Sequence, residues 1–226
     1  MTETRTSPES GTTPDLSEIE NDAERIVGQI ERESVDVYVW LSDVFDRGPI
    51  VENYVFQFVY RNFYGLDDAG LTSEFKSKYF ILLEENRGKA EIDIKSIARS
   101  LHEIPHSRGY KSLQFSFITK LGHTVNRSLP IYDRKIANLF DFEIPSGELE
   151  ASLSKYLDFY DKLRRLDTVV ISENLLPKSR GLFASMYSPS SSRVSQEKAL
   201  DFILWSSGKL GLRLPASVLE AVSISL

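Results

Sequence analysis

Hydrophobic residues recur at intervals of three and four along most of the chain, which is the spacing of the buried face of an α-helix. This spacing predicts helices over residues 16–30, 50–64, 72–88, 93–104, 113–125, 146–163 and 195–209, and a further helix begun by Asp133. The stretch 35–45 has an ambiguous period, for which we prefer a helix, and 168–176 suits a helix or a short extended piece. The sequence has no ladder of alternating strand residues. We therefore predict an all-α fold.

Turn-forming and polar residues divide the chain. Residues 1–16 are rich in Thr, Ser, Pro and Glu, which predicts a disordered tail and leaves residues 17–226 as a helical domain. Gly65 closes the second predicted helix, Pro105 cannot continue the fourth, and residues 187–193 read as a loop. The 226 residues are enough to bury a sizeable core.

Composition excludes several classes of protein. The chain has no cysteine, which rules out disulfides, thiolate zinc sites and cysteine-ligated iron–sulfur clusters. No apolar run reaches the ~18 residues that suggest a membrane span, and the polar start of the chain is unlike a secretory signal. We expect a cytoplasmic monomer that requires no cofactor and no membrane.

Positive charge is concentrated in the middle of the chain. Ten basic and four acidic residues lie between Arg87 and Lys135, a local net charge of +6 in a chain of net charge −6. A basic segment within an acidic protein is typical of a surface that meets phosphates, although a solvated face would have the same composition.

A short basic turn separates the helices predicted over 93–104 and 113–125. The N-terminus of the second helix would present free backbone N–H groups and a partly positive dipole end to an anion. Arg108 and Lys111 would add attraction, and Gly109 would allow a close approach of the backbone. A plain connection between two helices is an equally good interpretation of the turn alone. The candidate anion contacts are His106, Ser107, Arg108, Gly109, Tyr110 and Lys111.

Two charged residues on the following elements are the candidates for chemistry. Lys120 lies within an apolar helix, and burial there would lower its pKa and make the amine a nucleophile for a carbonyl or sugar carbon. The alternative is a lysine whose amine reaches solvent from the edge of the core. Asp133 follows Pro130 and suits an N-cap, a structural role that can coexist with a catalytic one. His102 and His106 do not predict a metal site, because Pro105 breaks the helical register between them.

The segments SFITKL (116–121) and LPIYDRKIA (129–137), behind a basic turn between two helices, resemble the helix-hairpin-helix DNA glycosylase superfamily. The resemblance is greatest to its 8-oxoguanine glycosylase-like branch, and the close match covers residues 114–137. It implies helical bundle lobes with a helix-hairpin-helix motif at about 93–126. It further implies a double-stranded DNA partner carrying a modified base.

The resemblance assigns roles to the candidates. Lys120 would attack the sugar C1′ of a flipped nucleotide, and Asp133 would stabilise the cationic transition state. Lys111 is the second candidate nucleophile, because some branches carry the lysine just after the hairpin glycine. Arg127 and Arg134 would join the turn in binding DNA.

The activity that the resemblance implies is excision of a modified or oxidised base, either with strand cleavage through a lysine Schiff base or, as in some members, with Asp133 and water alone. The alternatives are a non-catalytic DNA-binding protein and a helical protein-interaction domain. The sequence does not rank the aromatic candidates for a base pocket, which are Phe56, Tyr60, Phe183, Tyr187 and Trp205.

Overall fold

The computed structural model describes residues 13–223 of the chain. These residues form twelve α-helices and one 3-10 helix and contain no strand, which confirms the all-α prediction for this part of the chain. The tail predicted over 1–16 falls mostly outside the described residues. Pro14 and Leu16 are buried, so packing begins before residue 17. Among the described residues, no helix is both long and apolar enough to span a membrane.

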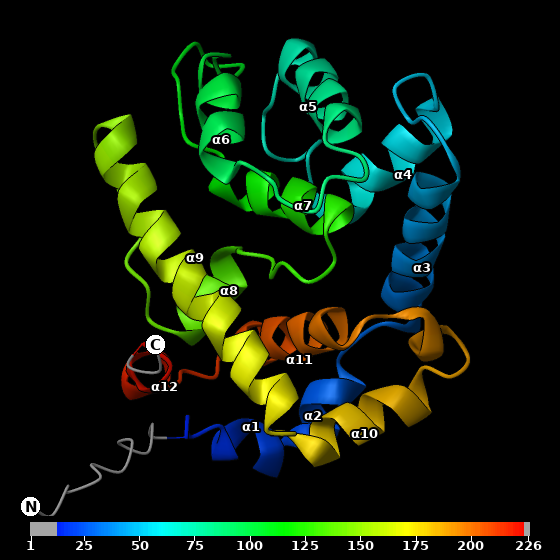
Figure 1. Cartoon of the computed structure of the whole chain (residues 1–226), viewed down its shortest axis with the longest axis vertical. Helices are drawn as coiled ribbons and strands as arrows, with labels where there is room; N and C mark the ends of the chain where they lie inside the picture. The colour runs from blue at the N-terminus through cyan, green and yellow to red at the C-terminus, as the bar shows by residue number, and fades with distance from the viewer. Residues whose placement is uncertain (1–12, 224–226) are drawn as a thin grey trace, which may run out of the picture.

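The helices gather toward the two ends of an elongated molecule (Figure 1). One group consists of α4 (Tyr54–Tyr64), α5 (Ser73–Glu85), α6 (Ile94–His102) and α7 (Phe115–Val125). The other consists of α1 (Ser17–Asn21), α2 (Ala23–Gly28), α10 (Pro177–Met186), α11 (Gln196–Lys209) and α12 (Ser217–Ala221). The elements that run between them or beside them are α3 (Arg32–Arg47), α8 (Arg134–Leu139), α9 (Leu149–Ser172) and the 3-10 helix η1 (Ser190–Arg193).

Several boundaries differ from the sequence-based expectations. The helix predicted over 16–30 is two helices that meet at Asp22, and the helix predicted from residue 50 begins at Tyr54, because the Asn53 side chain accepts from the Phe56 N–H. The ambiguous stretches 35–45 and 168–172 are helical. Helices α10 and α12 were not predicted, and part of the expected loop 187–193 is η1. In α10, Phe183 is the one hydrophobic side chain that is fully buried, so its apolar periodicity is weak.

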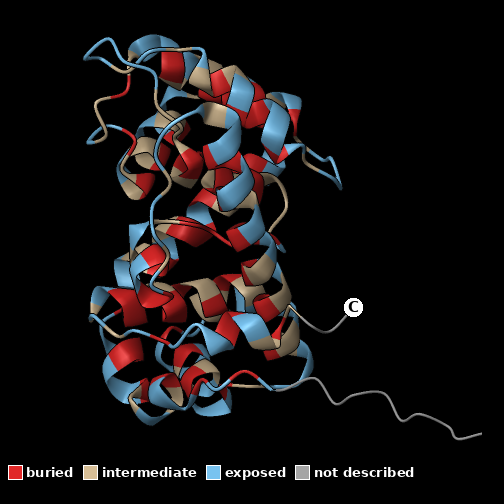
Figure 2. Ribbon diagram, turned by 90° about the vertical axis from the view of Figure 1, so that its left-hand side faces the viewer, coloured by how far each residue is buried: buried red, intermediate tan, exposed pale blue. Residues whose placement is uncertain are grey.

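One continuous cluster of buried hydrophobic residues joins the two groups, and the buried positions lie on the inward faces of the helices (Figure 2). Aromatic side chains form a large part of this cluster. The hydroxyls of Tyr60 and Tyr79 lie 2.9 Å apart, and Tyr79 also donates to the Phe117 carbonyl, which ties α4 and α5 to α7. Each of these two buried hydroxyls therefore has a hydrogen-bond partner, as buried polar groups in folded proteins usually do.

Candidate functional site

A cavity of about 350 Å³ lies where the start of α3, the end of α4 and helices α7, α8 and α11 meet. This volume falls within the range of about 300–1,000 Å³ that small-molecule sites occupy. The lining side chains that carry charge are Glu31, Lys120, Asp133, Lys198, Asp201 and Lys209. The structure therefore brings the two candidates Lys120 and Asp133 to one cavity.

Lys120 is held in the cavity wall by α7 and α4. Its Nζ donates to the carbonyl of Tyr64 at 3.1 Å and lies 4.9 Å from the centre of the Phe117 ring. Burial lowers the pKa of Lys120, while the nearby carboxylates of Asp133 and Asp201 oppose this shift. An ammonium that is poorly solvated gives up its proton more readily, which increases the nucleophilic amine form at neutral pH.

Asp133 is the N-cap of α8, as the sequence indicated. Its Oδ1 accepts from the backbone N–H groups of Lys135, at 2.8 Å, and Ile136, at 3.1 Å. No hydrogen bond from residues 13–223 ends on its Oδ2. One carboxylate oxygen thus fixes the side chain and the start of the helix, and the second is available to a bound molecule.

Helix α11 adds an ion pair that the sequence reading missed. Lys198 Nζ lies 2.5 Å from Asp201 Oδ2, and both side chains are at least nine-tenths buried. The Lys198 amine also lies over the rings of Phe202, at 4.4 Å, and Tyr38, at 5.0 Å. The available signal was the position of Lys198 and Asp201 on the same helical stripe as Phe202 and Trp205, because charged residues on an apolar stripe must be paired or exposed.

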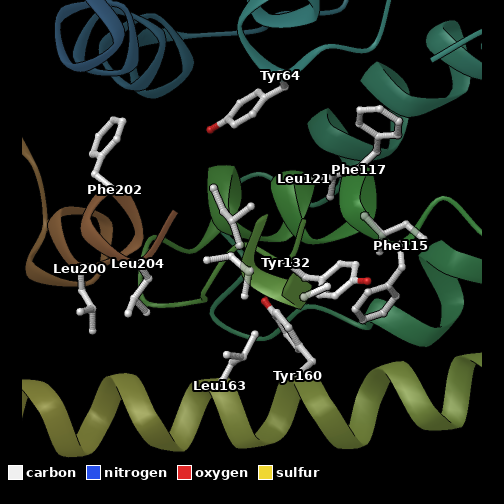
Figure 3. Packing of buried hydrophobic residues seen from close by; sticks show 14 of the residues in the cluster. Tyr64, Phe115, Phe117, Leu121, Tyr132, Tyr160, Leu163, Leu200, Phe202 and Leu204 are labelled. Atoms are coloured by element: carbon white, nitrogen blue, oxygen red, sulfur yellow. The ribbon is translucent and has the colours of Figure 1, made fainter. Parts of the chain in front are cut away.

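Aromatic side chains line the cavity from two directions. Tyr64 from α4 and Phe202 from α11 lie on facing sides, with the Tyr64 hydroxyl directed toward the side of Phe202 (Figure 3). Phe63 and Trp205 complete this set. Of the five aromatic candidates from the sequence, Trp205 lines the cavity. The other four, Phe56, Tyr60, Phe183 and Tyr187, are core residues.

The basic turn between α6 and α7 uses its own backbone N–H groups within the fold, whereas the N-cap residue Gln114 leaves the N-terminus of α7, the expected anion site, without a side-chain cap. The connection spans residues 103–114, and Gly109 has a φ of +83°, a conformation that favours glycine. Four successive backbone N–H groups, from His106 to Gly109, donate to acceptors within the protein. The ring of His106 stacks on Tyr110. A phosphate at this turn would therefore be held mainly by exposed side chains such as Arg108, because the turn's own N–H groups are occupied.

The remaining predicted DNA contacts lie outside the cavity lining. Lys111 is exposed and pairs with Glu103 at 2.6 Å, and Arg127 pairs with Asp46 at 2.7 Å. Ser107 and Arg134 are exposed, and Arg134 directly follows Asp133. Since several acidic partners of the basic segment come from elsewhere in the chain, part of its positive charge is neutralised in the fold. The second candidate nucleophile, Lys111, does not reach the cavity.

A buried histidine supports the loop that carries Asp133. His123 Nδ1 lies 2.7 Å from the Leu129 carbonyl, and its Nε2 lies 3.0 Å from the Tyr38 hydroxyl. Burial lowers the pKa of His123 to about 3, with a smaller contribution from the charge of Lys198. The ring is therefore neutral, with Nδ1 donating to Leu129 and Nε2 accepting from Tyr38. Within residues 13–223, no three His, Asp or Glu side chains are grouped to hold a metal ion.

No family model, no curated protein and no solved structure matches the chain.

Proposed function

We propose that the protein is a DNA glycosylase of the helix-hairpin-helix type, which flips a modified or oxidised base out of double-stranded DNA and excises it. The observation that carries this proposal is the convergence of Lys120 and Asp133, with the aromatic residues Tyr64, Phe202 and Trp205, on one cavity. Enzymes that act on a base place it between aromatic or apolar side chains after extrusion from the helix. The basic turn and Arg134 offer side chains to the flanking phosphates.

Lys120 and Asp133 have different roles in the proposed reaction. The neutral Lys120 amine attacks C1′ of the sugar, the C1′–N bond breaks, and the base leaves with the electron pair and takes up a proton. The Asp133 carboxylate stabilises the positive charge that develops on the sugar as this bond weakens. Loss of the proton from the attached nitrogen and opening of the sugar ring then give a Schiff base between Nζ and C1′. Loss of a proton from C2′ and departure of the 3′ phosphate from C3′ then form a C2′–C3′ double bond and cleave the strand.

Base release from a panel of duplexes, each with one oxidised or alkylated base, tests the proposal. We expect the parent protein to release at least one base and Asp133→Asn to bind the same duplex but release none. Binding without release in the parent protein would instead identify a non-catalytic DNA-binding protein. The absence of any salt-sensitive DNA binding would favour a protein-interaction domain.

A further inference from the structure

Of the other carboxylates that line the cavity with Asp133, which are Glu31 and Asp201, Asp201 is the one that affects the pKa of Lys120. Asp201 lines the cavity from α11, and its charge raises the pKa of the Lys120 amine, as does the charge of Asp133. A free carboxylate at this place would compete for Lys120 and hold it as an ammonium, a form that has no lone pair for attack. Asp133 is engaged by the backbone N–H groups of α8, and a nucleophilic Lys120 is favoured when Asp201 also has a partner of its own.

Lys198 is placed to be the counter-ion of Asp201. It lies one helical turn before Asp201, and the two side chains form an ion pair of 2.5 Å. Lys198 is 3 % exposed and its amine lies against two aromatic rings, so its position is fixed from several sides. Burial raises the pKa of Asp201, and the charge and hydrogen bond of Lys198 oppose that shift, which favours the ionised, paired carboxylate.

Stability alone does not account for this pair. A buried ion pair loses the hydration of both charges, and its replacement by apolar residues of similar volume is often neutral or stabilising. Helix α11 already has apolar residues on the same face, including Phe202 and Trp205. The pair is therefore better explained by its effect on the cavity that it lines.

We propose that Lys198 is a positioning residue, which as the counter-ion of Asp201 withholds that carboxylate from Lys120 and leaves the Lys120 amine free to act. The proposal rests on the proposed function for the use of that amine, but its electrostatic content applies to the protein without DNA. The titratable and charged groups that share the cavity with Lys120 are Glu31, Tyr64, Asp133, Lys198, Asp201 and Lys209. On its own helix, His123 is neutral.

The test measures how readily Lys120 is acetylated by a small activated ester at a series of pH values, with the extent read by peptide mass spectrometry. In Lys198→Met, the freed Asp201 stabilises the Lys120 ammonium, so the midpoint of labelling moves up by about one pH unit. In Asp201→Asn, the unpaired Lys198 charge disfavours that ammonium, so the midpoint moves down by a similar amount. The double variant lies between the two.

Two features make this outcome specific. Damage to the structure would move both single variants in the same direction, whereas removal of opposite charges moves them in opposite directions. Lys162→Met is the matched control, since Lys162 forms an exposed ion pair with Asp158 on α9 and does not line the cavity. The control leaves the midpoint unchanged.

Midpoints that stay in place, or that shift in the same direction in both variants, would overturn the role of Lys198. If Lys198→Met does not fold, Lys198→Gln takes its place, because it also removes the counter-ion: an upward shift of the Lys120 midpoint supports the role of Lys198, and an unchanged midpoint refutes it. A failure of the proposed function is detected in a different measurement, the base-release assay. It would leave these opposite shifts intact while no duplex loses a base.

Discussion

Gly208 of α11 lies directly against the backbone of Lys135 in α8. A Cβ added at Gly208 would be 2.2 Å from the Lys135 carbonyl oxygen, which is closer than atoms can approach. Lys135 is two residues after Asp133, and α11 carries Asp201. The contact therefore sets the distance between the two elements that bring carboxylates to the cavity.

Gly208→Ala is expected to destabilise the protein. The clash involves backbone on both sides, so neither helix can relieve it by a change of side-chain rotamer, and overpacking of this kind costs about 1–3 kcal/mol. Gly181→Ala in α10 is the control, since nothing lies within 4 Å of its added Cβ. Removing a glycine from a helix interior should stabilise by about 0.5–1 kcal/mol. Urea unfolding of both variants measures the difference, and equal midpoints would contradict the close packing of α11 on α8.

Asp133 has separable structural and chemical roles. Asparagine also caps helices well, so Asp133→Asn should unfold within about 0.5 kcal/mol of the parent protein, whereas Asp133→Ala should lose about 1 kcal/mol. Both variants lack the carboxylate, and both should fail to release a base. Thermal unfolding combined with the release assay measures both roles. Full release by Asp133→Asn would show that the cap alone matters.

The neutral state of His123 makes stability depend on pH. Its pKa is about 3 in the folded protein and about 6.5 in the unfolded chain, so the unfolded state binds the extra proton between these values. Stability from this group is complete above the unfolded pKa and is lost as pH falls toward 3. His123→Gln should therefore reduce the slope of unfolding free energy against pH by about 1.4 kcal/mol per unit between pH 6 and pH 4. An unchanged slope would mean that His123 can be protonated in the fold.

Arg108 and Lys111 should contribute unequally to DNA binding. Arg108 is exposed and forms no ion pair within residues 13–223, whereas Lys111 is paired with Glu103. Arg108→Gln should lower the slope of log affinity against log salt by about 0.9, the value for one phosphate contact, and Lys111→Gln should lower it less. Lys178→Gln in α10 is the control for loss of a positive charge elsewhere. A slope unaffected by Arg108→Gln would place the DNA away from the turn.

The sequence was most informative where local rules decide the structure. The N-cap at Asp133 is where it was predicted, because a side chain that accepts from the next backbone N–H groups depends only on nearby residues. The helical spacing also located α5, α7 and the end of α11. Helix α10 was not predicted, because it is stabilised mainly by its contacts with α2 and α11 and its own apolar periodicity is weak.

The cavity depends on long-range packing, which periodicity does not specify. Lys120 and Asp133 were found from their chemistry and a family resemblance, but Lys198 and Asp201 are more than 60 residues farther along the chain. Their meeting with Lys120 requires the packing of α11 on α8. The basic turn between α6 and α7 was itself predicted from local residues, but its long-range contacts were not. Arg108 and Gly109 are turn residues as predicted, but the Ser107 N–H donates to the Gly70 carbonyl and the His106 ring lies 2.8 Å from the Ala69 carbonyl, contacts that the local pattern does not include.

Borohydride trapping on a duplex with a modified base tests the central claim most directly. Hydride reduces the Schiff base to a stable amine, so the adduct marks the nitrogen that attacked C1′. We predict an adduct with the parent protein and with Lys111→Ala, and none with Lys120→Ala, while all three proteins bind the duplex. An adduct that persists in Lys120→Ala, or one that disappears in Lys111→Ala, would contradict the assignment of Lys120 as the nucleophile.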